Sequence, residues 1–298
     1  MAKPSVDHTV LKAIGNTPVI RIKNVYAKIE IMNPSGSIKD RVALEMIEAA
    51  ERDGQLKEGY TVVEPSSGNT GIALSMVAAA KGYTCIIVMP ENMSEERRSL
   101  MHAFGAEILI TSKSGSLSEA IEKAEELAQE PATFMPHQFS NPNNVVAQEK
   151  TGKELLEQVG PVDAVVAGVG TGGTLMGITN VMKEVSPDLK VIAIEPKEAA
   201  VMFGGSEAPI EEHKIQGIGD GFIPKIVDMS RVDDVITVGS EEAVDMARRL
   251  SREYGLLVGI SAGANMLVSL DLSSKFKKIA TVLPDRGDRY LSMDLFKY

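Results

Sequence analysis

The sequence predicts an α/β protein with two lobes, each a mostly parallel β-sheet flanked by helices. Short runs rich in β-branched residues alternate with helical segments in two series along the 298 residues, and this alternation is typical of parallel sheets with helical crossovers. Between the two series, three prolines and a Ser/Asn cluster in Pro131–Asn144 interrupt both periodicities. The 44% hydrophobic composition is sufficient for a substantial core.

The first series builds the smaller lobe, for which we expect residues 1–10 and 32–140. The Ser/Gly turn before Lys39 is expected to cap a helix that continues through Arg41–Ala50. The strands expected next are Thr61–Glu64, Thr84–Met89 and Glu107–Thr111, and the helices that follow them begin at Thr70, Ser94 and Leu117.

The second series builds the larger lobe, for which we expect residues 11–31 and 141–298. Its expected strands are Asp163–Ala167, Lys190–Glu195, Val235–Val238 and Lys278–Leu283, with helices that begin at Gly173 and Ser240. Ligand sites in open α/β sheets form at the carboxyl ends of strands, and clefts between lobes favour them. We therefore expect the functional site where the lobes meet.

Composition excludes several classes of function. The formal net charge of −10 disfavours nucleic acid or an anionic membrane as a partner, since both bind basic surfaces. Apolar runs such as Thr84–Met89 and Val162–Val169 are far shorter than a bilayer span, and the N-terminal residues lack a secretion signal. We expect a cytoplasmic protein.

Cysteine and histidine carry little of the expected chemistry. The single cysteine, Cys85, excludes an internal disulfide, and its strand-like surroundings predict a buried, inert thiol. The four histidines are scattered, without the i, i+4 spacing of metal ligands, so we expect no metal site.

A glycine-rich turn follows the strand Asp163–Ala167. Gly168, Gly170 and Gly173 match the G-x-G-x-x-G pattern, and Glu195 ends the next strand, as a dinucleotide-binding site requires. The physical requirement is less specific, because glycines and a helix amino terminus favour any phosphate monoester. We interpret Gly170–Thr174 as a phosphate-binding cup, which leaves both NAD and pyridoxal phosphate as ligands.

Lys39 favours pyridoxal phosphate. It lies in Asn33–Arg41, in the expected first turn of a helix, where an ammonium is disfavoured and a neutral amine is therefore a better nucleophile for an aldehyde. A second turn, Ser66–Gly71, gathers hydroxyl and amide groups beside free N–H donors, which suits a bound carboxylate. An NAD-dependent dehydrogenase leaves both features without a role.

The whole chain resembles the O-acetylserine sulfhydrylase (cysteine synthase) family of fold type II pyridoxal-phosphate enzymes. The resemblance rests on the two turns above together with G-N-T-P (Gly15–Pro18), H-Q-F-S-N-P-N-N (His137–Asn144), H-K-I-Q-G-I-G (His213–Gly219), V-G-I-S-A-G-A (Val258–Ala264) and R-Y-L-S (Arg289–Ser292). These motifs occur in the family's order.

The resemblance implies a role for each matching residue. Lys39 would bind pyridoxal 5′-phosphate covalently and later remove the α-proton. The other implied cofactor contacts are Gly170, Thr171, Gly172, Gly173 and Thr174 for the phosphate, Asn69 for the 3′-oxygen and Ser261 for the pyridine nitrogen. The substrate carboxylate would bind Ser66, Ser67, Asn69, Thr70 and Gln138.

The implied activity is a transferase reaction of cysteine biosynthesis. It is a β-replacement that converts O-acetyl-L-serine and sulfide to L-cysteine and acetate. The Ser261 hydroxyl, unlike an aspartate, does not strongly favour a protonated pyridine, which favours prompt β-elimination. The resemblance further implies a homodimer, with serine acetyltransferase as a candidate partner.

Alternatives within the family are O-phosphoserine sulfhydrylase and cystathionine β-synthase. Two departures from the family's pattern concern the first of these. Arg286 stands where a small residue is common and is a candidate reader of a substrate phosphate, whereas Asp220 replaces the common alanine and would repel that phosphate. Ser66 replaces the usual threonine and keeps the hydroxyl.

Overall fold

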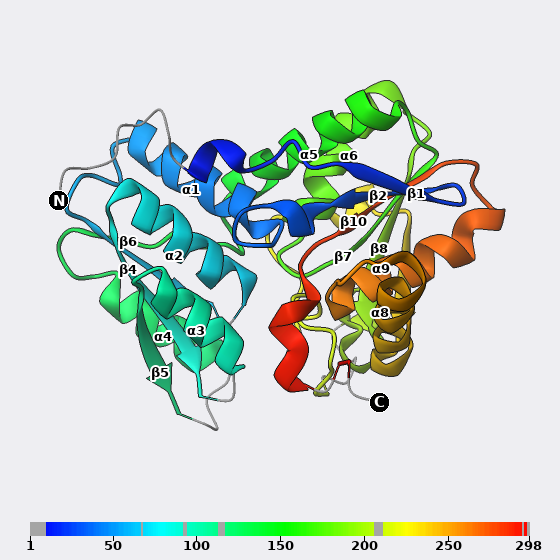
Figure 1. Ribbon diagram of the computed structural model, residues 1–298. Helices are drawn as coiled ribbons and strands as arrows, with labels where there is room; N and C mark the ends of the chain where they lie inside the picture. Colours follow the sequence, from blue (N-terminus) through cyan, green and yellow to red (C-terminus); the bar gives the residue numbers. More distant parts are fainter. Residues whose placement is uncertain are drawn as a thin grey trace.

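Two sheets, each covered by helices on both faces, make up the fold of the computed structural model (Figure 1). It describes residues 10–66, 68–91, 94–112, 117–205, 211–293 and 295–296. The α/β fold class with two mostly parallel sheets is confirmed.

The smaller sheet has the strand order β5-β4-β3-β6, and all its strands are parallel. These are β3 (Thr61–Pro65), β4 (Thr84–Pro90), β5 (Glu107–Thr111) and β6 (Thr133–Phe134). Its helices are α1 (Lys39–Arg52), α2 (Asn69–Lys81), α3 (Glu95–Ala103) and α4 (Leu117–Leu127). Successive strand side chains point to opposite faces, so Val62 packs with α1 and α2 whereas Val63 packs with α4.

The larger sheet has the order β1-β2-β10-β7-β8-β9, with β1 antiparallel to β2 and the remaining pairs parallel. Its strands are β1 (Val19–Ile22), β2 (Val25–Ile29), β7 (Ala164–Gly168), β8 (Lys190–Pro196), β9 (Asp234–Val238) and β10 (Ile279–Leu283). The main helices are α5 (Asn143–Val159), α6 (Gly173–Val185), α8 (Ser240–Tyr254) and α9 (Ile260–Asp271). Val165 packs with α5 and α6, and Val166 packs with α8 and α9.

The remaining helical segments are short. They are η2 (Val10–Ala13), η3 (Glu30–Met32), η4 (Lys197–Ala199), α7 (Val201–Gly204), η6 (Met229–Arg231), η7 (Leu272–Ser274) and η8 (Gly287–Met293). None of the helices in the described part of the chain is both long and apolar enough to cross a bilayer.

The segment Pro131–Asn144 contains more structure than its prolines suggest. Thr133 and Phe134 add the parallel strand β6 to the smaller sheet, and α5 begins at Asn143. Cys85 is buried in β4, and burial raises the pKa of its thiol to about 12, so the expectation of an inert cysteine is confirmed.

A buried ionic cluster ties α1 to the larger sheet. Arg41 of α1 contacts Glu30 at 2.7 Å and Glu154 of α5 at 2.6 Å, and Lys28 of β2 contacts Glu154 at 2.7 Å. Burial alone would raise the pKa of Glu154, but the hydrogen bonds from Arg41 and Lys28 lower it to about 2. The helix that begins at Lys39 is therefore held firmly against α5.

Candidate active site

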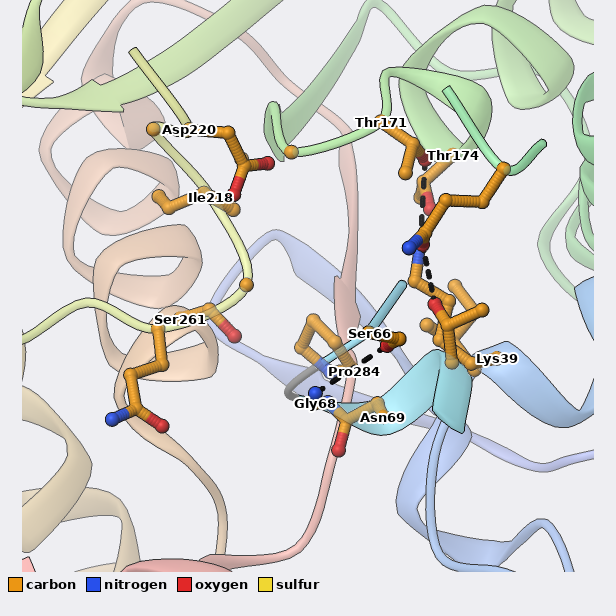
Figure 2. A pocket seen from close by; sticks show the side chains of 18 of the residues that line it. Lys39, Ser66, Gly68, Asn69, Thr171, Thr174, Ile218, Asp220, Ser261 and Pro284 are labelled. Atoms are coloured by element: carbon orange, nitrogen blue, oxygen red, sulfur yellow. Dashed lines mark hydrogen bonds between the residues drawn. The ribbon is translucent and has the colours of Figure 1, made fainter. Parts of the chain in front are cut away.

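A cavity of about 870 Å³ lies where the elements of the two sheets meet. Turns that follow β3 and β7 open into it, as expected for the carboxyl ends of parallel strands. The predicted site residues that line it are Lys39, Ser66, Asn69, Thr70, Gln138, Gly170, Thr171, Gly172, Thr174 and Ser261. Figure 2 labels Lys39, Ser66, Asn69, Thr171, Thr174 and Ser261 among them. Residues from opposite ends of the sequence therefore share one chamber.

Lys39 is the first residue of α1, as the sequence predicts. The helix N-cap is Ile38, which has no polar side chain, and the Ser37 hydroxyl accepts the N–H of Lys39 at 3.3 Å instead. The amine of Lys39 donates to the Thr171 hydroxyl at 3.3 Å. Burial lowers the pKa of Lys39 to about 8, against the opposing charge of Asp220. The neutral amine is therefore still the minor form at neutral pH, but it is far more abundant than in an ordinary lysine.

The turn Gly170–Thr174 connects β7 to α6 and requires its glycines. A Cβ on Gly170 would lie 2.2 Å from the carbonyl oxygen of Gly217, and Gly172 has a φ of +85°. Asn144 occupies the space that a side chain on Gly173 would need, so Gly173 supports the turn from behind and does not line the cavity. Backbone N–H groups at the start of α6 then face a small concave space, which fits a phosphate monoester.

Asn144, in the first turn of α5, holds this cup in place. Its sequence context alone predicts no such role. Its amide nitrogen donates to the Thr171 hydroxyl at 3.0 Å and to the Gln138 carbonyl at 2.9 Å. The cup and the Gln138 segment are thus joined through one buried side chain. Its signal in the sequence was its place at the end of H-Q-F-S-N-P-N-N.

The turn after β3 forms the second candidate binding surface. The Ser66 hydroxyl accepts the N–H of Gly71 at 3.0 Å, and the Thr70 hydroxyl donates to Gln138 Oε1 at 2.6 Å. Ser67 lies outside the described residues. Ser66, Thr70 and Gln138 therefore meet on one wall, as expected for groups that bind a carboxylate together.

Glu64, just before this turn, holds the backbone of the Gln138 segment. Its two carboxylate oxygens accept the N–H groups of His137 and Gln138, each at 3.0 Å. His137 has a φ of +57°, a conformation that is unfavourable for a residue with a side chain. Burial raises the pKa of Glu64 to about 7, although both hydrogen bonds oppose the shift.

Asn69 begins α2 and is held at both ends of its amide. Its nitrogen donates to Asp285 at 2.8 Å, and its oxygen accepts a hydrogen bond from Arg289. One amide N–H is left to point toward a ligand. Asp285 and Arg289 had no predicted role. Their position in Pro284–Arg289, directly after β10, could have indicated a functional role, because polar groups at the carboxyl end of a strand commonly line a binding site.

Ser261 lies in the first turn of α9 and lines the cavity opposite the Ser66 turn (Figure 2). One turn further along the helix, Asn265 accepts the N–H of Gly168 at 2.8 Å and donates to the Val282 carbonyl at 2.9 Å. The helix is thereby fixed to the ends of β7 and β10, which holds Ser261 in place.

The two departures from the family's pattern differ in location. Asp220 lines the cavity, whereas Arg286 does not. Arg286 instead pairs with Asp288 at 2.9 Å, and both side chains are largely exposed. The structure therefore gives no support to Arg286 as a reader of a substrate phosphate.

Glu195 explains why the glycine pattern does not indicate a dinucleotide site. Its carboxylate accepts the N–H groups of Met202 at 2.9 Å and Phe203 at 2.7 Å, which stabilises the start of α7. Both oxygens are thus engaged with the backbone and are not turned toward a ribose. In the described part of the chain, no cluster of three or more His, Cys, Asp or Glu side chains has the arrangement of a metal site.

Comparisons with known proteins agree with this geometry. The family model for pyridoxal-phosphate dependent enzymes matches residues 10–285. A cysteine synthase of Staphylococcus aureus (strain Mu50 / ATCC 700699) is 46% identical over an alignment of 312 residues that covers 100% of this chain and 99% of the relative.

Solved structures give the same result. A cysteine synthase (OASS) from Entamoeba histolytica superposes with a TM-score of 0.91 at 37% identity, covering 100% of this chain and 94% of that one. An O-acetylserine dependent cystathionine β-synthase from Helicobacter pylori gives a TM-score of 0.92 at 36% identity, covering 98% and 100%. The chain belongs to the family of pyridoxal-phosphate dependent enzymes.

Proposed function

We propose that this protein is a cysteine synthase, which replaces the acetoxy group of O-acetyl-L-serine with sulfide to give L-cysteine and acetate. The observation that carries the proposal is the meeting of the Lys39 amine with the Gly170–Thr174 cup in one cavity, 3.3 Å apart at Thr171. The similarity to cysteine synthases over the full chain supports the same activity.

The residues of the cavity fit pyridoxal 5′-phosphate. The cup formed by Gly170, Thr171, Gly172, Gly173 and Thr174 would hold the phosphate through N–H groups at the start of α6. The remaining amide N–H of Asn69 would bind the 3′-oxygen of the cofactor, and Ser261 would face the pyridine nitrogen. When bound, the cofactor supplies an aldehyde for the substrate amine and a ring that accepts electrons.

The protein's own groups orient the substrate and move its proton. Ser66, Thr70 and Gln138, with Ser67, would bind the substrate carboxylate in the turn after β3 and fix the α-carbon beside Lys39. A neutral amine accepts a proton, and burial keeps much of Lys39 neutral near pH 8. Lys39 Nζ therefore serves as the base that removes the α-proton. A hydroxyl at Ser261 leaves elimination as the favoured outcome.

A cystathionine β-synthase type of reaction is the second candidate. The relative from Helicobacter pylori carries that name and shares the fold over nearly the whole chain, and the cavity of about 870 Å³ is large enough for a thiol amino acid. The two reactions use the same donor and differ in the sulfur compound.

The organisation of the protein follows from the same resemblance. The smaller lobe would comprise residues 1–10 and 32–140, and the larger lobe 11–31 and 141–298. The enzyme would act in the cytoplasm as a homodimer, with serine acetyltransferase as a partner.

The proposed function is tested with purified protein supplied with pyridoxal phosphate. Cysteine formation from O-acetylserine is measured with sulfide, and cystathionine formation with homocysteine. We expect Lys39→Ala to lose at least a thousandfold in activity and the visible absorbance of the covalently bound cofactor. Lys153→Ala, an exposed change on α5, is the control and should keep both. Wild-type protein that makes neither product, or a Lys39→Ala variant with unchanged absorbance, contradicts the proposal.

A further inference from the structure

Asp220 places a carboxylate in the cavity that faces the Lys39 side (Figure 2). It lies between Gly219 and Gly221, which have φ angles of +73° and +81°. The preceding residue is firmly held, because the N–H of Gly219 donates to the Val169 carbonyl at 3.0 Å and its own carbonyl contacts His213 Nε2 at 3.0 Å. The backbone just before Asp220 is therefore fixed beside Val169, which precedes the phosphate cup.

In the part of the chain that the structure describes, the Asp220 carboxylate has no partner that would neutralise it. Within the described residues, no group donates a hydrogen bond to it and no Lys or Arg lies within 4.0 Å, although Lys39 and His213 interact with it over longer distances. Besides these, the ionisable side chains that line the cavity among the described residues are Arg97, Glu211, Glu212 and Lys214. Arg97 lies over the ring of Tyr290, and Lys214 pairs with Glu241. Asp220 is exposed to the solvent that fills the cavity, so its charge needs no partner and can act on a ligand that enters there.

We propose that Asp220 is a specificity-determining residue that excludes donors with an anionic group on the β-carbon. The inference rests on the proposed function and names the substrate class within it. O-Acetylserine carries an uncharged ester, whereas O-phosphoserine carries a dianionic phosphate that would enter the same space as the carboxylate. Like charges repel one another, and more strongly once a bound donor displaces water between them. Specificity commonly depends on such a repulsive element.

The position of Arg286 supports the same conclusion. A site built for a phosphorylated donor needs a cation beside the leaving group, and this arginine is paired with Asp288 outside the cavity. Lys39 is the proposed base at the α-carbon and is therefore not available to bind a phosphate on the β-carbon. Among the described residues, the cavity thus offers a phosphate the negative charge of Asp220 and no dedicated cation.

The test compares kcat/KM for O-acetylserine and O-phosphoserine at a fixed sulfide concentration. Wild-type enzyme should prefer O-acetylserine by at least a hundredfold. Asp220→Asn should shift the ratio toward O-phosphoserine by at least tenfold, Asp220→Ala should shift it in the same direction, and Asp220→Glu should keep the wild-type preference. Asp245→Asn, which removes the same charge from an exposed position on α8, should leave the ratio within twofold.

Salt provides a readout that a merely structural role would not change. Because electrostatic exclusion is screened by ions, raising the ionic strength should weaken the preference of the wild type but not that of Asp220→Asn. The inference is overturned if wild-type enzyme uses O-phosphoserine as well as O-acetylserine, or if Asp220→Asn and Asp220→Ala slow both donors equally. Cysteine formation from O-acetylserine by the wild type tests the proposed function separately, so the two failures are distinguishable.

Discussion

The amide nitrogen of Asn69 and the carboxylate of Asp285 are joined by a hydrogen bond of 2.8 Å. Asn69 begins α2 beside the smaller sheet, and Asp285 follows β10 of the larger sheet. Asp285 is fully buried and also accepts the Tyr290 hydroxyl at 2.6 Å. One carboxylate therefore orients a candidate cofactor ligand and connects the two halves of the site.

Replacing Asp285 with alanine is expected to destabilise the fold. The change leaves the Tyr290 hydroxyl and one Asn69 N–H without an acceptor, and each unsatisfied buried group costs about 1–3 kcal/mol. We expect the free energy of unfolding to fall by roughly 2–4 kcal/mol, measured by urea denaturation. Tyr290→Phe removes one hydrogen bond and should cost about 1 kcal/mol. Equal losses in the two variants would show that Asp285 stabilises through Tyr290 alone.

Cofactor capture by Lys39 is expected to depend on pH. The neutral amine is the reactive form, and burial lowers the pKa of Lys39 to about 8, so the neutral fraction increases as pH rises through that value. Cofactor-free protein mixed with pyridoxal phosphate should gain visible absorbance faster as pH rises, with a half-maximal rate near pH 8. Asp220→Asn removes a charge that raises the pKa of Lys39, so its profile should move to lower pH. A half-maximal rate near the ordinary lysine pKa would contradict this.

Most of the fold was predictable because strands buried on both faces and their helices have strong periodic patterns. The predicted strands at Thr61, Thr84, Glu107 and Lys190 begin where β3, β4, β5 and β8 begin. The hairpin Val19–Ile29 was not predicted, because its two short antiparallel strands precede the repeating strand–helix pattern. Strand β6 was missed because two residues carry no detectable period.

The residues of the candidate site that lie together in one short turn were predictable from the sequence. The glycines of Gly170–Thr174 and the hydroxyls of Ser66 and Thr70 each form a short local pattern that predicts a binding turn. Asp285, Asn144 and Glu64 act through hydrogen bonds to residues far away in the sequence. Nothing in their own neighbourhood indicates those partners, which come together only in the folded protein.

A side chain at Gly173 is expected to disrupt the phosphate cup. Its Cβ would lie 2.0 Å from Asn144 Oδ1, which forces Asn144 to give up its 3.0 Å hydrogen bond to Thr171. We expect Gly173→Ala to weaken binding of pyridoxal phosphate at least tenfold, as measured by equilibrium dialysis. Glu184→Ala, an exposed change on the same helix, should bind as the wild type does. Unchanged affinity in Gly173→Ala would mean that the phosphate binds elsewhere.

Glu64 is expected to make stability depend on pH. Burial raises its pKa from 4.5 to about 7 in the folded protein, so the native state binds the proton more tightly than the unfolded chain does. The free energy of unfolding should therefore fall as pH rises from about 4.5 to about 7, and stay lower above that range, by about 3 kcal/mol for this group. Glu64→Gln cannot titrate and should lack this contribution.

The measurement for Glu64 is the difference in unfolding free energy between wild type and Glu64→Gln across this pH range. Asp40, whose pKa burial raises to about 6, titrates in both proteins and cancels in the difference. Glutamine turns an amide N–H toward the backbone N–H of either His137 or Gln138, so the variant should also show a higher KM for the amino-acid donor. A difference that stays constant with pH would mean that Glu64 titrates at its ordinary value.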